Sequence, residues 1–130
     1  MPSIFSKIVR NEIPSYKVYE NENFVAFLDI NPLKKGHTLV IPKIEVDYIF
    51  DLESKEYQEL WNFAKLVAKG MKRVIKCERI SIVVMGLEVP HAHIHLIPLD
   101  SMQDIDFSQP KLNLSSDQMI KIASLINSAI

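Results

Sequence analysis

The chain has 130 residues, of which 48% are hydrophobic and 24% charged, and its formal net charge at pH 7 is −1. These values fit one soluble globular domain with a substantial core, and the charge gives no bulk attraction to nucleic acid or to an anionic membrane. The lone cysteine, Cys77, excludes an internal disulfide framework, and no apolar run reaches the roughly 18 residues of a membrane span. Because the N-terminus has no signal-peptide core, we expect a cytoplasmic location.

The first half of the sequence predicts a short helix followed by three strands. The predicted elements are a helix over residues 3–10, strands over 17–20, 23–28 and 37–41, and a helical turn over 47–51. Ser3 is the candidate N-cap of the first helix, because a serine oxygen there accepts a free backbone N–H. Strand-favouring residues on both sides of Asn21-Glu22-Asn23 predict a hairpin around this turn.

The second half predicts two substantial helices and two further strands. These elements are a long helix from Ser54 to about Lys76, strands over 79–85 and 91–97, a polar irregular segment over 100–114, and a C-terminal helix opened by residues 115–118. Ser54 is the candidate N-cap of the long helix, and Ser115 with Gln118 has the pattern of a capping box. The apolar, β-branched run from Arg79 to Met85 predicts a central strand.

The predicted strands number about five, and most of them are joined by short turns. Short connections favour antiparallel neighbours. The long helix has an apolar face that must be covered, formed by Leu60, Phe63, Ala64, Val67, Met71, Val74 and Ile75. We therefore expect an α+β fold, an antiparallel five-stranded sheet with the long helix and the C-terminal helix packed on it.

The segment Pro90-His91-Ala92-His93-Ile94-His95-Leu96-Ile97-Pro98 holds three of the four histidines. Their spacing of i, i+2 and i+4 is a strand pattern, so we expect the three imidazoles on one face and Ala92, Ile94 and Leu96 on the other. The fourth histidine, His37, begins another predicted strand. Histidines without a role are seldom gathered in this way, so we expect this segment to carry chemistry.

Two kinds of chemistry fit the cluster. In the first, the histidines bind a metal such as zinc, although three consecutive side chains of one strand seldom converge on one ion. Only Glu88 and Asp100 supply carboxylates nearby for a harder metal. In the second, His93 is a nucleophile, because a neutral imidazole has a lone pair that attacks phosphorus or an acyl carbon. Both neighbouring imidazoles would then be within reach to stabilise charge and transfer protons.

The sequence resembles the histidine triad (HIT) family. His91 to Ile97 matches in full the motif of that family, in which three histidines alternate with apolar residues and a further apolar residue follows. The segments Ile4 to Pro14, and Phe27 to Pro32 followed by Gly36 to Lys43, resemble the branch called histidine triad nucleotide-binding proteins. The resemblance covers most of the chain and implies a single HIT domain over residues 1–130 with a HIT-like fold.

The resemblance implies a nucleotidyl hydrolase or transferase that acts at the α-phosphate of a purine nucleotide, of the nucleoside phosphoramidate type. His93 would attack the phosphate to form a covalent nucleotidyl-histidine, and water would then release AMP. His91 and His95 would flank the nucleophile, and His37 would lie beside the α-phosphate with His95. No metal or other cofactor is required for this chemistry.

The resemblance also implies which residues hold the nucleotide. Asp29 would bind the ribose hydroxyls, because a carboxylate accepts two O–H bonds. The apolar pocket for the base would be formed by Phe5, Ile8, Ile13, Phe27 and Ile30. For Ile8 and Phe27, packing in the core explains the residue as well as contact with the base does.

The sequence departs from the family before the triad and near its N-terminus. The segment Met85 to Pro90 is short and lacks the amide side chains of many members, so Glu88 is a candidate for a role near the leaving group or for capping the turn. Some bacterial members bind a structural zinc through a Cys-x-x-Cys and a later histidine. Here Ser3, Ser6 and Glu45 fall at those positions, and we predict no structural zinc.

The resemblance implies a homodimer with the long helix and an edge strand at the two-fold interface, and neither nucleic acid nor membrane is an expected partner. Other activities fit the sequence as well. They are a dinucleoside polyphosphate hydrolase, a nucleotide-binding regulatory module with weak turnover, and a metal-dependent hydrolase with His91, His93 and His95 as ligands. The segment from Asp100 onward, which helps to select the leaving group in this family, matches little of the family pattern.

Overall fold

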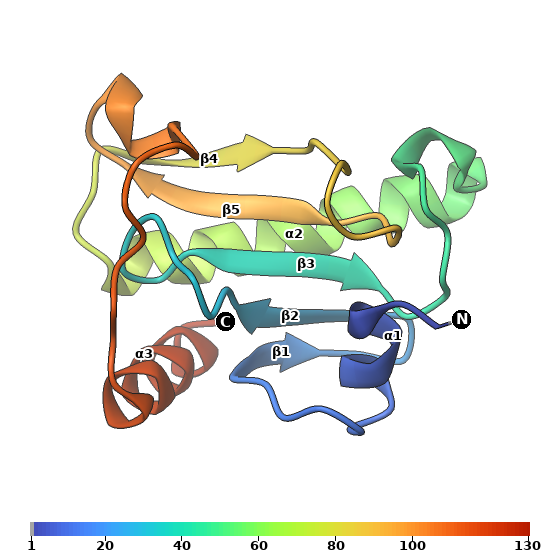
Figure 1. Ribbon diagram of the computed structural model, residues 1–130, viewed down its shortest axis with the longest axis horizontal. Coiled ribbons are helices and arrows are strands. Elements are labelled where there is room, and N and C mark those ends of the chain that lie inside the picture. Colours follow the sequence, from blue (N-terminus) through green and yellow to red (C-terminus); the bar gives the residue numbers. More distant parts are fainter. Residues whose placement is uncertain (1) are drawn as a thin grey trace.

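The computed structural model describes residues 2–130, which form a five-stranded antiparallel sheet with helices on both faces (Figure 1). The strands are β1 (Lys17–Glu20), β2 (Phe24–Leu28), β3 (Thr38–Pro42), β4 (Arg79–Val83) and β5 (Ile94–Leu99). The helices are α1 (Ile4–Val9), α2 (Ser54–Val74) and α3 (Ser116–Ser128), with short 3-10 turns η1 (Ile49–Asp51) and η2 (Met102–Ile105). Within residues 2–130, no helix has the length and hydrophobicity needed to cross a bilayer.

The strands lie in the order β1-β2-β3-β5-β4, and every neighbouring pair is antiparallel. Helix α2 crosses behind the sheet, α3 packs beside it near β1, and α1 lies on the opposite face (Figure 1). The expected α+β class, with the long helix and the C-terminal helix on an antiparallel sheet, is confirmed.

The alternation of side chains along the strands divides the core into two apolar layers. Toward α2 and α3 the sheet presents Phe24, Ala26, Leu28, Val40, Ile94 and Leu96. Toward α1 it presents Val25, Phe27, Leu39 and Ile41, which pack with Phe5 and Ile8 of that helix. His95 is the cross-strand partner of Leu39 and therefore lies on the α1 face. The candidate functional residues thus stand on this face, with most of the core behind them.

Local sequence accounts for two of the three helix starts. The Oγ of Ser3 accepts the N–H of Ser6 at 3.0 Å and caps α1 as predicted. Ser115 and Gln118 form both halves of the predicted capping box of α3. For α2 the prediction was wrong, since Glu53 occupies the cap position without a side-chain capping bond and Ser54 is the first helical residue. The backbone of Glu53 is already extended, with ψ 151°, so the chain turns into the helix one residue earlier than the serine indicates.

Two predictions about strands were also wrong. The run from Arg79 predicts a central strand over 79–85, but β4 ends at Val83 and lies at the edge of the sheet, paired only with β5. β-Branched residues favour a strand wherever it lies, so the run does not distinguish an edge from a centre. The sequence also predicts a strand over 91–97, but β5 begins at Ile94, where its ladder with β3 begins. His91 and His93 therefore lie in the loop before β5, and only His95 is in the strand.

Candidate active site

Three strands bring two of the predicted histidines and the predicted acidic residue together. His37 lies two residues before Leu39, the cross-strand partner of His95, so its side chain falls on the same face of the sheet. Asp29 follows β2 directly, and its N–H donates to the carbonyl of His37 at 2.9 Å. The side chains then meet: Nε2 of His37 lies 2.9 Å from Nδ1 of His95 and 3.5 Å from Oδ2 of Asp29.

The hydrogen bonds fix where the protons lie in this group. The backbone N–H of Leu33 donates to Nδ1 of His37 at 3.1 Å, so the neutral ring carries its proton on Nε2. That proton is donated to Nδ1 of His95, which leaves Nε2 as the protonated nitrogen of His95. Burial lowers the pKa of His37 to about 3 and the pKa of His95 to about 4, so both rings are neutral at pH 7. His95 therefore offers an N–H donor.

His93 has the opposite tautomer from His95 in its neutral form. Its Nδ1 lies 2.7 Å from the carbonyl oxygen of His91, which only accepts, so Nδ1 carries the proton and Nε2 keeps a lone pair. The ring lies edge-on to Phe5 and to His95, with its centroid 5.0 Å from each. An unprotonated nitrogen thus stands beside an N–H donor, the two groups that an attack on phosphorus requires.

His91 contacts His93 through its backbone and not through its ring. Its Nε2 donates to the carbonyl of Pro42 at 2.8 Å, and its Nδ1 lies 2.9 Å from the hydroxyl of Ser3. Burial lowers the pKa of the His91 ring and so favours its neutral form. The expectation that both neighbouring imidazoles reach His93 holds for His95. It fails for His91, because both nitrogens of that ring are engaged by other groups.

A cavity of about 220 Å³ lies between α1, the end of β2 and the histidine segment. Its walls include all seven residues that the sequence proposes for the nucleotide, namely Phe5, Ile8, Ile13, Phe27, Asp29, Ile30 and Glu88. His93 and His95 line it as well, whereas His37 and His91 are almost fully buried outside its lining. The fold therefore joins the apolar pocket and two of the histidines in one concave site.

Ile8 and Phe27 belong both to the core and to the wall of this cavity. They are 7% and 3% exposed within the apolar layer under α1, and Phe5 packs edge-on to Phe27 with ring centroids 5.5 Å apart. Packing in the core is thus confirmed for both residues, and the same side chains are available to a ligand. Ile30 differs from them, since it is 69% exposed at the mouth of the cavity.

Asp29 and Glu88 place two carboxyl groups on the cavity wall. Oδ1 of Asp29 accepts the N–H of Asn31 at 2.8 Å, which orients the group just after β2. Burial raises the pKa of Asp29, and the charge of Glu88 acts in the same direction. Glu88 itself is exposed in the loop before the triad. A ligand in this cavity therefore meets one half-buried and one exposed carboxyl group.

Among the described residues, Asp29, His37 and His95 form the group best placed to hold a metal, with one ligand atom of each within 4.8 Å of the others. Their hydrogen bonds oppose this role. A metal at Nε2 of His37 would require its proton on Nδ1, where it would face the N–H of Leu33. A metal shared by the three triad histidines does not fit either, because both ring nitrogens of His91 are engaged elsewhere. The arrangement of these side chains is suited to hydrogen bonding and not to binding a metal.

Sequence reasoning missed Phe107, which lies in the irregular segment after β5. Its ring lies edge-on to His95 and His37, with centroid distances of 5.1 and 6.2 Å. The N–H of Leu112 donates to the carbonyl of Pro32 at 2.8 Å and holds this segment against the loop after β2. No periodicity marks residues 100–114, so only the three-dimensional structure identifies Phe107 as part of the site.

Comparison with known proteins shows which family the chain is similar to. The family model of the HIT domain matches residues 10–102. A HIT-like protein of Methanocaldococcus jannaschii is 39% identical over 127 residues, which are 91% of this chain and 95% of that protein. The purine nucleoside phosphoramidase of Escherichia coli is 34% identical over 105 residues, or 73% of this chain and 85% of the enzyme. The adenosine 5′-monophosphoramidase of Saccharomyces cerevisiae is 38% identical over 96 residues, or 73% of this chain and 61% of the enzyme.

Solved structures have the same fold. The crystal structure of a HIT-like protein from Bartonella henselae matches with a TM-score of 0.86 at 29% identity, over 98% of this chain and 96% of that one. A hypothetical histidine triad nucleotide-binding protein from Sulfolobus tokodaii matches with a TM-score of 0.85 at 28% identity, over 96% of this chain and 89% of that one. The resemblance in sequence and the HIT-like fold are both confirmed, and the chain belongs to the HIT family.

Proposed function

We propose that this chain is a hydrolase that cleaves between the α-phosphate and the leaving group of a purine nucleotide, with nucleoside phosphoramidates as its substrate class. The observation that carries the proposal is the pairing of an unprotonated Nε2 on His93 with the N–H donor of His95, in the wall of a cavity that also holds Asp29. Two relatives, from E. coli and S. cerevisiae, are named as phosphoramidases, which supports this class.

In the proposed reaction, Nε2 of His93 attacks the α-phosphorus, and the bond from phosphorus to the leaving nitrogen breaks. The nitrogen takes up one proton and leaves as the amine, and His93 becomes a cationic nucleotidyl-histidine. The carbonyl of His91, 2.7 Å from Nδ1, stabilises this positive charge. Water then attacks phosphorus, the bond to Nε2 breaks, and AMP and one proton are released.

Other residues of the cavity are proposed to hold the substrate. His95 donates its Nε2 proton to a phosphate oxygen, and His37 maintains the tautomer of His95 that makes this possible. Asp29 accepts hydrogen bonds from the ribose hydroxyls. The apolar wall formed by residues such as Phe5 and Phe27 suits a flat purine ring.

The position of Glu88 favours an amine leaving group over an anionic one. Glu88 is exposed on the cavity wall beside His93, and the loop around it carries no amide or cationic side chain. A carboxylate next to a phosphate leaving group is unfavourable, whereas next to a protonated amine it is favourable. This charge argues against the alternative in which the substrate is a dinucleoside polyphosphate with a nucleotide as leaving group.

The experiment is a steady-state assay of AMP release from adenosine 5′-phosphoramidate and, in parallel, from diadenosine polyphosphates. We expect faster release from the phosphoramidate, no effect of a chelator, and a loss of about 10³-fold or more in His93→Ala. Preference for the polyphosphates would favour the alternative substrate class. Binding of AMP without turnover would favour a regulatory module, and release that persists unchanged in His93→Ala would refute the role of this residue.

We also propose that the chain forms a homodimer through the free edge of β4. Ile82 on this strand is 45% exposed and Val84 just after it is 36% exposed, which is unusual for the edge strand of a monomer. A cavity of about 660 Å³ adjoins this edge and is lined in part by the aromatic residues Tyr48, Phe50, Tyr57 and Trp61. Light scattering should give twice the chain mass of 14.9 kDa, and Ile82→Lys should reduce it to one chain. A monomer for the unaltered protein would contradict this proposal.

A further inference from the structure

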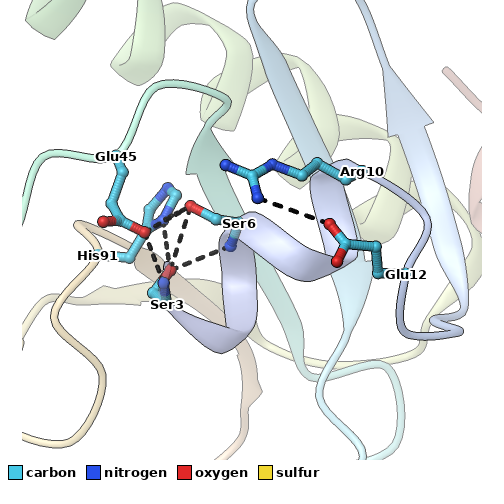
Figure 2. Close-up of polar contacts among 6 residues, drawn as sticks. All are labelled: Ser3, Ser6, Arg10, Glu12, Glu45 and His91. Carbon is cyan, nitrogen blue, oxygen red and sulfur yellow. Dashed lines mark hydrogen bonds and ion pairs between the residues drawn. The ribbon is translucent and has the colours of Figure 1, made fainter. Parts of the chain in front are cut away.

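Four residues from three parts of the chain form a hydrogen-bonded cluster behind the active site, shown in Figure 2. Ser3 and Ser6 come from the start of α1, Glu45 follows β3, and His91 opens the triad. Oε1 of Glu45 accepts from the backbone N–H of Ser3 and from the hydroxyl of Ser6, both at 2.6 Å. The hydroxyl of Ser3 accepts the N–H of Ser6 at 3.0 Å and lies 2.9 Å from Nδ1 of His91.

The distances within this cluster favour one acceptor for each proton. Nε2 of His91 must carry a proton, because its partner is the carbonyl of Pro42, so Nδ1 of the neutral ring accepts. The Ser6 hydroxyl is 2.6 Å from Glu45 but 3.4 Å from His91, so its proton goes to the carboxylate. The two serines lower the pKa of Glu45 to about 2, which keeps that acceptor ionised. The hydroxyl of Ser3 lies 2.9 Å from Nδ1 of His91 but 3.4 Å from the Ser6 hydroxyl oxygen, so its proton goes to the imidazole.

The cluster reaches the proposed nucleophile through the backbone of His91. The His91 carbonyl accepts Nδ1–H of His93 at 2.7 Å, and that bond leaves Nε2 of His93 with its lone pair. Residues 91–93 lie outside the β5 ladder, so the sheet does not hold their backbone. Hydrogen bonds to other segments hold them instead. They include the bond from the N–H of Ala92 to the carbonyl of Val46 at 2.7 Å and the two bonds of the His91 ring.

We propose that Ser3 is a positioning residue for catalysis, and that its hydroxyl holds the His91 ring so that the His91 carbonyl fixes the reactive tautomer of His93. The inference rests on the proposed function, since it gives a reason for the reactivity of the same histidine. Ser3 does not touch the substrate cavity and acts only through His91. Helix α1 thereby connects the hydrogen-bonded cluster with the active site, because it carries Ser3 at its cap and Phe5 against the rings of both His91 and His93.

The substitution that tests this role is Ser3→Ala, and the chain offers a matched control. Ser115 is also an N-cap serine whose side chain accepts a backbone N–H, but it caps α3, away from the histidines. Each alanine removes one cap, which has a similar effect on stability in both helices. Only Ser3→Ala also removes the donor to Nδ1 of His91. Ser3→Thr, which keeps the hydroxyl, is the conservative variant.

The test combines the kcat for adenosine 5′-phosphoramidate with the ring tautomer of His93, read by ¹⁵N NMR in the protein without substrate. For Ser3→Ala we expect kcat to fall about tenfold, the fold-change that corresponds to one hydrogen bond, while KM changes little. We also expect the Nδ1–H tautomer of His93 to lose population. Ser115→Ala should keep the native kcat and tautomer, and Ser3→Thr should restore both.

Equal kcat and an unchanged His93 tautomer in Ser3→Ala and Ser115→Ala would overturn the inference. If Ser3→Ala does not fold, Ser3→Gly takes its place, because glycine also lacks the hydroxyl and is tolerated at an N-cap with a much smaller loss of stability. That variant should shift the His93 tautomer in the same direction, and no shift would overturn the inference. The NMR measurement needs no turnover, so failure of the proposed function is seen separately, as absence of AMP release by the native chain.

Discussion

Two buried histidines of the site, His37 and His95, predict that the protein loses stability as the pH falls from 7 to 5. Burial lowers the pKa of His37 to about 3 and the pKa of His95 to about 4, whereas an unfolded histidine titrates near pH 6.5. The unfolded chain therefore binds protons first. The stabilisation is fully present above pH 6.5 and is lost as the pH falls toward the folded pKa values.

The magnitude follows from the titration of the unfolded chain. Consider a histidine that stays neutral in the folded protein and has a pKa of about 6.5 in the unfolded chain. Lowering the pH from 7 to 5 reduces its contribution to the free energy of unfolding by about 2 kcal/mol. His37 and His95 together therefore lower the free energy of unfolding by about 4 kcal/mol, and the lowered pKa of His91 acts in the same direction. The raised pKa of Asp29 acts in the opposite direction. A loss of this size is a large part of the about 5–15 kcal/mol typical of a folded domain.

Urea unfolding at pH 5, 6 and 7, followed through the fluorescence of Trp61, measures this loss. His37→Gln is the informative variant, since it removes one of the two titrating groups and should reduce the difference between pH 7 and pH 5 by about half. A free energy of unfolding that stays constant or rises from pH 7 to pH 5 would refute the reasoning. It would mean that one or both rings are protonated in the folded protein.

Two further predictions concern a turn and the proposed ribose site. Gly36→Ala should lower the melting temperature more than Gly86→Ala. Both glycines have positive φ (91° and 73°), but only at Gly36 would an added Cβ collide with a neighbour, Cδ1 of Ile75. Equal shifts in thermal unfolding would show that the contact does not matter. Asp29→Asn should raise the KM for adenosine 5′-phosphoramidate about tenfold or more with a much smaller change in kcat, because a charged acceptor for ribose is lost. A fall in kcat at constant KM would assign Asp29 to the chemical step instead.

Local patterns predicted the elements whose causes are local. The capping box of Ser115 and Gln118 needs only four residues in sequence, and the structure has both of its bonds. The hairpin around Asn21 is equally local, since the side chain of Asn21 accepts the N–H of Asn23 and of Phe24. These features depend on side chains near the backbone groups that they satisfy, so a single sequence is enough to predict them.

Features that depend on distant partners were missed or misplaced. The place of β4 in the sheet is set by which strand pairs with it, and the apolar run of Ile80, Ile82 and Val83 is the same for an edge and a centre. The period-two motif begins at His91, three residues before β5, because the ladder with β3 ends at the pair of Val40 and Ile94 even though β3 itself continues to Pro42. The bond between Ser3 and Glu45 joins residues 42 positions apart and has no signature in the sequence.

The candidate site itself was predicted mainly by resemblance. Spacing alone singled out the triad and the central position of His93, but only the family resemblance named Asp29, His37 and the apolar wall. The structure brings these residues together, and its hydrogen bonds indicate which ring nitrogens carry protons. The N–H of Leu33 and the carbonyl of His91 decide which nitrogen of each ring is reactive, and backbone groups of this kind leave no trace in residue types.

The most direct test of the proposed chemistry is intact mass spectrometry of the protein mixed briefly with adenosine 5′-phosphoramidate, alongside His93→Ala. We expect the native protein to gain the mass of one adenylyl group and the variant to gain none, with quench-flow used to trap the adduct if its hydrolysis is fast. AMP release by the native protein without an adduct at any time, or an adduct that also forms on His93→Ala, would contradict a nucleotidyl intermediate on His93.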